Sequence, residues 1–296
     1  MEMRDIMSKI AILTDSSCDI PQELAEKYGI DIMSFHILLD DVDYIERESC
    51  TNTEFYDKMR EAKGVPSTAA ITPIQFCEKY CQYVDEGYTD VIHVPINKSG
   101  SSTYNNALMA QGMLREERPE HHLKIHLLDP HTYSMVFGWY LCEMARKLQN
   151  GAEISHVIRE FEKQMNCMEI ILGPYSLRQM KKSGRISAAA AVMGELMGIR
   201  PIITLIDGKT KVEAKVRGDE KVVSAMVELC KKRSEGVEDF DYMIGHTNIR
   251  QAEDLEKACR KAFGKPPLIV FELGGVVSAN TGPDTVALVY TGHPRG

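Results

Sequence analysis

Short apolar runs alternate with amphipathic segments along the first half of the chain. Lys9–Thr14 is typical of a buried strand, and the segment that opens at Pro21 and stops at Gly29 is typical of a helix. Strands that alternate with helices along the chain are joined by right-handed crossovers, and this arrangement gives a parallel sheet covered on both faces. We therefore predict that residues 1–165 form a parallel α/β (Rossmann-like) domain. Its further strands are expected over 30–39, 90–96 and 124–128, and its helices over 53–62, 74–84, 102–115, 135–148 and 154–165.

The pattern changes after residue 165. Ile199–Ile206 and Lys211–Val216 flank the turn residues Asp207 and Gly208, which predicts an antiparallel hairpin. A hairpin makes the sheet mixed, so residues 166–296 are predicted to form a mixed-sheet α/β domain. Its other strands are expected over 168–173, 242–246, 268–273 and 286–290, and its helices over 175–182, 186–197, 220–233 and 251–263.

Composition narrows the class of protein. The 296 residues are 44% hydrophobic and 26% charged, which is typical of a soluble globular protein. The net charge of −8 argues against binding to DNA or RNA. No apolar run approaches the roughly 20 residues of a membrane-spanning helix, and Met1–Ile12 lacks the core of a signal peptide. We expect a cytoplasmic protein with no nucleic-acid partner and no stable membrane insertion.

The cysteines give little sign of a metal site. All eight are scattered, and none has zinc-finger spacing. Cys77 and Cys81 lie one helical turn apart and offer half a site, but no second pair of ligands follows. Free thiols in the core or on the surface are the favoured interpretation, so we predict no metal ligands.

Two loops rich in hydroxyl groups are the best candidates for binding a ligand, because ligands of open α/β sheets lie beyond the carboxyl ends of the strands. The loop 65–73 ends in a Thr-Pro pair that is expected to open a helix, which leaves Ser67 and Thr68 for a ligand. The loop 97–104 precedes a helix, where hydroxyls and backbone N–H groups form an anion site. A nucleophilic serine would need a base and an orienting acid, and no GxSxG elbow is present. A serine-dependent acyl hydrolase or transferase is therefore the alternative, not the first choice.

Four other segments are candidates for a role, and three of them have two alternative interpretations. The loop Thr14–Asp19 either caps the next helix or belongs to a site, and Ser278–Asp284 is expected to be a turn. The small-residue helix 186–198 either packs closely on a sheet or lines an apolar tunnel. The basic loop 181–185 is either solvated or binds a phosphate or an acidic partner.

Seven short segments, in order along the chain, together resemble one protein family. They are TDSSCDIP at 14–21, PSTAAITP at 66–73, SSTY at 101–104, KKSGRIS at 181–187, GIRPI at 198–202, VR at 216–217 and TGP at 281–283. They are similar to the TDSxxDLP, PxTSQPSP, SGTY, KKGGRIS, IKPI, VR and HTGPG segments of the DegV family, whose characterised members are bacterial fatty-acid-binding proteins. Asn280 stands where the last of these has histidine.

The resemblance implies a two-domain protein that buries one long-chain fatty acid between its domains. Thr68 and Ser101 fall on the threonine and serine that hydrogen-bond the carboxyl group in the family. We expect three neighbours of that head group and an apolar tunnel along the small-residue helix. The neighbours are Asn280, Ser102 and Thr103, and the tunnel candidates are Ala190, Ala191, Met193 and Met197.

The resemblance also implies a carrier, not an enzyme. Some members of the family present the carboxyl group to a fatty acid kinase, and Arg185 is the candidate contact with such a partner. No cofactor is expected, because the only ligand is the fatty acid. The other alternative is an α/β protein that binds partners and holds no small ligand.

Overall fold

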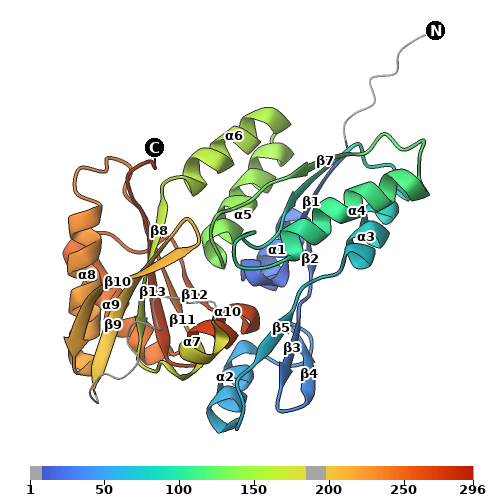
Figure 1. The fold of residues 1–296 in the computed structure, drawn as a ribbon. Coiled ribbons are helices and arrows are strands. Elements are labelled where there is room, and N and C mark those ends of the chain that lie inside the picture. Colours follow the sequence, from blue (N-terminus) through green and yellow to red (C-terminus); the bar gives the residue numbers. More distant parts are fainter. Residues whose placement is uncertain (1–8, 185–197, 296) are drawn as a thin grey trace.

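The first half of the chain carries a four-stranded parallel sheet, drawn in blue to green in Figure 1. The computed structural model describes residues 9–184 and 198–295. Strand order in this sheet is β2-β1-β6-β7, and all neighbours are parallel, which confirms the parallel sheet expected here. The elements are β1 (Ile10–Asp15), α1 (Gln22–Tyr28), β2 (Ile30–Met33), α3 (Pro73–Asp85), β6 (Asp90–Val94), α4 (Thr103–Glu117), β7 (Lys124–Leu127), α5 (Met135–Gln149) and α6 (Ile154–Met165).

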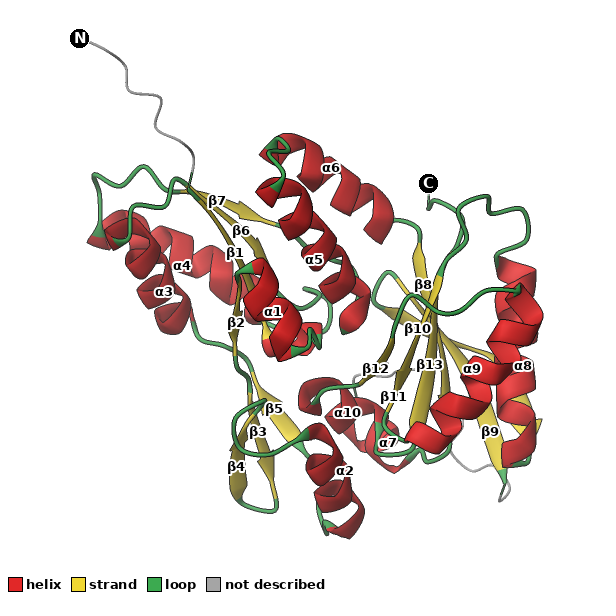
Figure 2. Cartoon of the chain, turned by 180° about the vertical axis from the view of Figure 1, so that it is seen from behind, coloured by secondary structure: helices red, strands yellow, loops and turns green. Residues whose placement is uncertain are grey.

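Both faces of this sheet are covered by helices. Ala11 and Leu13 of β1 pack with α3 and α4, whereas Ile12 between them packs with α1 and α5. Figure 2 shows these two helix pairs on opposite sides of the sheet. Because successive side chains of a strand point to opposite faces, a strand covered on both faces is apolar throughout. This accounts for the uninterrupted apolar run in β1.

The helix ends follow the local signals in the sequence. Thr72 caps α3 with its side chain, and Gln75 completes a capping box around it, with Pro73 in the first turn. Gly29 ends α1 in the left-handed conformation, at φ 63°. The residues next to each helix end were therefore sufficient to predict where α3 begins and α1 ends.

The second half carries a six-stranded mixed sheet. Its order is β10-β9-β8-β13-β11-β12, with β11 and β12 parallel and the other pairs antiparallel. The predicted hairpin is confirmed as β9 and β10. The elements are β8 (Met168–Pro174), α7 (Arg178–Ser183), β9 (Ile199–Ile206), β10 (Lys209–Arg217), α8 (Val222–Arg233), β11 (Tyr242–His246), α9 (Ile249–Phe263), β12 (Val270–Glu272) and β13 (Thr285–Thr291).

The two faces of the mixed sheet meet different partners. Ile171 and Leu288 point outward and pack with α8 and α9. Ile170, Leu172 and Val289 point inward and belong to the same apolar cluster as α5 and α6 of the first half. The two halves therefore share one core, and the inner face of the mixed sheet lies between them (Figure 1).

The segment expected as one strand over 30–39 is divided between two sheets, so that prediction is wrong in part. The chain leaves the parallel sheet after Met33, and the Phe35 N–H donates to Ser16 Oγ at 3.0 Å. The following residues form a hairpin, whose tight turn has positive φ at Asp40 and Asp41. This turn lacks the glycine found in most turns of this kind, so its sequence signal is weak. The unpredicted sheet has the order β4-β3-β5 and consists of β3 (His36–Leu39), β4 (Val42–Ile45) and β5 (Ser67–Ala69), with α2 (Asn52–Glu61) between β4 and β5 in the chain.

The expected turn at 278–284 is also wrong, because most of it belongs to a helix. Helix α10 spans Gly275–Thr281. Its first turn is held by Glu46 of the other half, whose Oε1 accepts a hydrogen bond from Val276 N at 2.7 Å. A cap supplied from 230 residues away leaves no signal in the local sequence.

Two glycines in helices give opposite predictions for stability. A Cβ at Gly138 in α5 would lie 2.3 Å from the carbonyl oxygen of Cys18, whereas a Cβ at Gly112 in α4 would meet nothing within 4 Å. We expect Gly138→Ala to lower the free energy of unfolding by about 1–3 kcal/mol through overpacking. Gly112→Ala should raise it by roughly 0.5–1 kcal/mol, because alanine restricts the unfolded chain. Urea unfolding of both variants is the measurement, and a Gly138→Ala variant as stable as the parent would contradict this packing of α5.

Candidate functional site

An apolar cavity lies between the two halves, against the inner face of the mixed sheet. The space open to the centre of a water molecule is about 180 Å³. Its described lining is Phe35, Thr68, Ala70, Ile96, Gly100, Ser101, Ser102, Tyr133, Ser134, Val136, Ile170, Leu172, Leu205, Gly208, Phe271, Leu273, Val276, Val277, Asn280, Thr281, Ala287 and Val289.

The apolar wall comes mainly from alternate residues of the mixed sheet. Ile170 and Leu172 lie on β8, and Ala287 and Val289 lie beside them on β13. Val136 of α5 faces them from the first half. These side chains repeat with the period of two that places residues on one face of a strand. The wall is thus built into the sheet itself.

The polar wall comes from the two hydroxyl-bearing loops that the sequence singled out. Thr68 projects from β5, and Ser101 and Ser102 immediately precede α4. The start of this 15-residue helix carries partial positive charge from its free N–H groups. Within the described ranges 9–184 and 198–295, the Thr68 and Ser102 hydroxyls have no hydrogen-bond partner. They are therefore available to a ligand.

Ser101 is held in place by its neighbour. Its Oγ lies 2.8 Å from Oγ1 of Thr103 and accepts a hydrogen bond from Thr103 N at 3.2 Å. Thr103 itself is fully buried and does not line the cavity. Asn280 does line it, and donates its side-chain amide to the Val276 carbonyl at 2.8 Å.

The turn between β9 and β10 closes on the serine loop. Gly208 has φ 70°, and a Cβ there would lie 2.3 Å from Ser99 Oγ and 2.4 Å from Asn97 Nδ2. Beside it, Asp207 pairs with His131 of the first half at 2.9 Å. Glycine suits this position because of its positive φ and because it leaves room for the Ser99 and Asn97 side chains. Gly208 also lines the cavity, so the second half forms part of its wall at the carboxylate-binding candidates.

Three buried carboxyl groups support the site from behind without lining the cavity. Asp15 accepts hydrogen bonds from Ser17 N at 3.1 Å and Ile96 N at 2.7 Å, and thereby fixes the ends of β1 and β6 next to each other. Burial outweighs these bonds and raises the pKa of Asp15 to about 7. The loop Thr14–Asp19 thus supports the site through Asp15, but it does not cap the next helix as one interpretation expected, because the N-cap residue of α1 is Pro21, with no side-chain cap.

Asp19 and Glu46 are the other two carboxyl groups, and they flank Gly274. A Cβ at Gly274 would lie 2.3 Å from Asp19 Oδ1 and 2.8 Å from Glu46 Oε1. Burial, and after it the neighbouring Glu46, raise the pKa of Asp19, and burial raises the pKa of Glu46. Asp19 also accepts a hydrogen bond from Ser134, which begins α5.

The described lining residues of the cavity are chemically suited to binding. Tyr133 is the only ionisable side chain among its described lining residues. No described histidine forms a hydrogen bond to Ser101 or Ser102. A serine nucleophile needs such a base within reach, so the described residues give no support to acyl transfer.

The structure places some of the residues predicted for the site in one cavity, while others lie outside the residues that it describes. Thr68, Ser101, Ser102 and Asn280 line one cavity. The tunnel candidates and the kinase-contact candidate lie outside the described residues; these are Ala190, Ala191, Met193, Met197 and Arg185.

Sequence reasoning missed the apolar wall on the mixed sheet. The signal was present, because the central residues of both strands, 170–172 of β8 and 286–289 of β13, are apolar whichever face they point to. Such strands must be covered on both faces, and α8 and α9 cover the outer one, which leaves the inner face to other elements.

Comparison with known proteins gives a consistent set of relatives. A family model described as "Uncharacterised protein, DegV family" matches residues 9–292. A DegV domain-containing protein of Clostridium perfringens is 28% identical over 284 residues, which cover 95% of this chain and 98% of that protein.

Solved structures share the fold over nearly the whole length. A fatty acid binding DegV family protein from Streptococcus agalactiae has a TM-score of 0.83 at 27% identity, over 97% of this chain and 99% of its own. A DegV family protein from Thermus thermophilus, described by its fatty acid binding, has a TM-score of 0.84 at 24% identity, over 96% and 100%. Within the described residues, no helix has the length and apolar character needed to span a membrane.

The carboxyl pair beside Gly274 generates a prediction for pH dependence. A native carboxyl group with a raised pKa keeps a proton that the unfolded chain has already released above about pH 4. Its contribution to stability is therefore complete below that pH and is lost as pH rises through the native pKa. We expect Asp19→Asn to make the fall in unfolding free energy between about pH 4 and pH 8 shallower, by at most about 1.4 kcal/mol per pH unit.

Urea unfolding at a series of pH values measures this slope. Glu48→Gln is the matched control, since Glu48 is exposed on the same segment as Glu46. A slope that is the same in the parent and in Asp19→Asn would show that Asp19 titrates as an ordinary exposed carboxyl group.

Proposed function

The chain belongs to the DegV family, and from the cavity we propose that it binds one long-chain fatty acid between its two halves. The observation that carries the proposal is the division of the cavity into a sheet-built apolar wall and a group of hydroxyls at a helix start. An aliphatic chain with one polar end matches that division. The relative from Streptococcus agalactiae, itself described as fatty acid binding, supports the same ligand class.

The affinity would come from the aliphatic chain. Each buried methylene contributes roughly 0.8 kcal/mol, so a dozen of them contribute on the order of 10 kcal/mol before the cost of ordering the ligand. The carboxyl group then needs only to be oriented. Neutral hydroxyls from Thr68 and Ser101 suffice to orient it. Ser102 and Asn280 line the same cavity and are the proposed neighbours of the head group.

The proposed role is that of a carrier without catalytic machinery. It extends to presenting the carboxyl group to a fatty acid kinase, with Arg185 as the contact. This extension rests on the KKSGRIS segment at 181–187 alone, because Arg185 lies outside the described residues. The proposed tunnel along Ala190 and Met193 has the same basis.

Removing the two hydroxyls tests the head-group assignment. We expect Thr68→Val combined with Ser101→Ala to weaken the binding of palmitate by one to two orders of magnitude, since each lost hydrogen bond costs about 0.5–1.5 kcal/mol. Isothermal titration of the delipidated protein provides the dissociation constants. Ser67→Ala is the control, because Ser67 is exposed on the same strand and does not line the cavity. An unchanged dissociation constant in the double variant would refute the assignment.

Filling the apolar wall tests the path of the aliphatic chain. Ala287 is a small residue in a wall of larger ones, so Ala287→Leu and then Ala287→Phe should progressively reduce the space. We expect the preference for long over short fatty acids to fall by about tenfold or more in the larger variant, because roughly two methylenes lose their burial. Ala214→Leu, at an exposed position of β10 in the same sheet, is the control. Equal losses for all chain lengths would place the chain elsewhere.

A further inference from the structure

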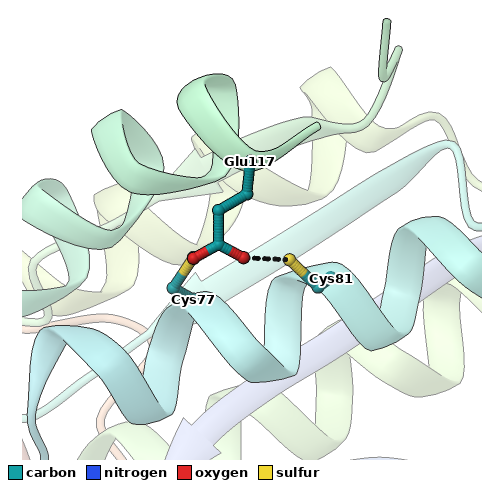
Figure 3. Close-up of side chains that lie close together, drawn as sticks. All are labelled: Cys77, Cys81 and Glu117. Carbon is teal, nitrogen blue, oxygen red and sulfur yellow. Dashed lines mark hydrogen bonds between the residues drawn. The ribbon is translucent and has the colours of Figure 1, made fainter. Parts of the chain in front are cut away.

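A compact group of two thiols and one carboxyl group lies far from the cavity wall. Cys77 and Cys81 are four residues apart on α3, which places both sulfurs on one face of the helix. Glu117 closes the last turn of α4, which packs against α3. Figure 3 shows its carboxyl group reaching down so that one oxygen lies near each sulfur. None of the three residues lines the cavity.

The spacing within this group is that of metal ligands. The two sulfurs and a carboxylate oxygen all lie within 4.8 Å of one another, and Cys81 Sγ is 3.6 Å from Glu117 Oε2. Ligands of tetrahedral zinc lie about 2.0–2.3 Å from the metal, which separates them from each other by about 3.5–3.8 Å. A cation at the centre would therefore need only small movements of three side chains.

The surroundings limit which cation would fit. Cys77 is 1% exposed and Cys81 8%, while Glu117 is exposed, so the group opens to solvent on the side of the carboxylate. Soft thiolates select zinc over magnesium or calcium. Arg118 follows Glu117 directly and forms an ion pair with Asp85 at 3.7 Å.

We propose that Cys77, Cys81 and Glu117 form a zinc site that links the middle of α3 to the end of α4. Two sulfurs and one carboxylate oxygen bind the ion, and a water molecule takes the fourth, solvent-facing position. Both thiols release their protons to solvent as the two Zn–S bonds form. The complex then carries one net negative charge.

Without a cation, the thiols are protonated. Burial, followed by the neighbouring Cys81, raises the pKa of Cys77 to about 12, and burial and the Glu117 carboxylate raise the pKa of Cys81. Zinc must compete with these protons, so its affinity should rise with pH, by up to about a hundredfold per pH unit for two released protons. The same three residues without zinc form a thiol–carboxylate hydrogen bond, and this is the competing account.

Zinc titration of the full-length protein against a chromophoric chelator distinguishes the two accounts. We expect one equivalent to bind tightly, and Cys77→Ser, Cys81→Ser and Glu117→Gln each to weaken binding at least tenfold. Cys50→Ser and Glu116→Gln are the controls, since each retains the whole group. Cobalt should give the ultraviolet charge-transfer band of a cobalt–thiolate bond, and the band should disappear in both cysteine variants.

A second readout guards against variants that fail to fold. Zinc should raise the thermal midpoint of the parent and of both controls, but not that of Glu117→Gln, whose exposed substitution leaves the packed thiols in place. Equal zinc affinity in the parent and Glu117→Gln, or no thiolate band with cobalt in the parent, would overturn the proposal. Both readouts are independent of lipid binding, so failure of the fatty acid proposal would leave them unaffected.

Discussion

The inner face of the mixed sheet must be covered, and the rest of the structure depends on this constraint. Its central strands β8 and β13 are apolar on both sides, and α8 and α9 cover only the outer side. The first half covers the inner side with α5, through residues such as Val136, but leaves a cavity along it. A space between two apolar faces is itself lined by apolar groups, which is why it suits the aliphatic ligand proposed above.

Hydrogen bonds across the two halves fix the polar end of this space. Glu46 receives the Val276 N–H, and the Tyr56 hydroxyl donates to the Leu273 carbonyl at 2.5 Å. Arg178 donates to three successive carbonyls of residues 62–64, at 2.7–2.9 Å, just before β5. These bonds hold two elements against the same cavity. They are β5, which carries Thr68, and α10, which carries Asn280. The buried carboxyl groups are part of the scaffold that orients the hydroxyls.

The sequence was informative where a signal is local. The hydroxyl-bearing loop before α4, the Thr72 cap and the Asp207–Gly208 hairpin depend on a few adjacent residues, and the structure has them. The other segment expected as a hydroxyl loop instead contains strand β5. The sequence was uninformative where the cause is distant. Helix α10 depends on Glu46, the split after Met33 depends on Ser16, and the third member of the thiol group, Glu117, comes from another helix. Each is a contact between segments whose proximity no short pattern encodes.

The central claim, that the cavity holds a fatty acid, is tested most directly by native mass spectrometry of the protein as purified from a bacterial host. We expect a bound species with the mass of one long-chain fatty acid per chain, released by denaturation and identified in the organic extract. Delipidated protein should take up one equivalent of palmitate under the same conditions. Protein that is free of lipid in every preparation and takes up no added palmitate would contradict the account.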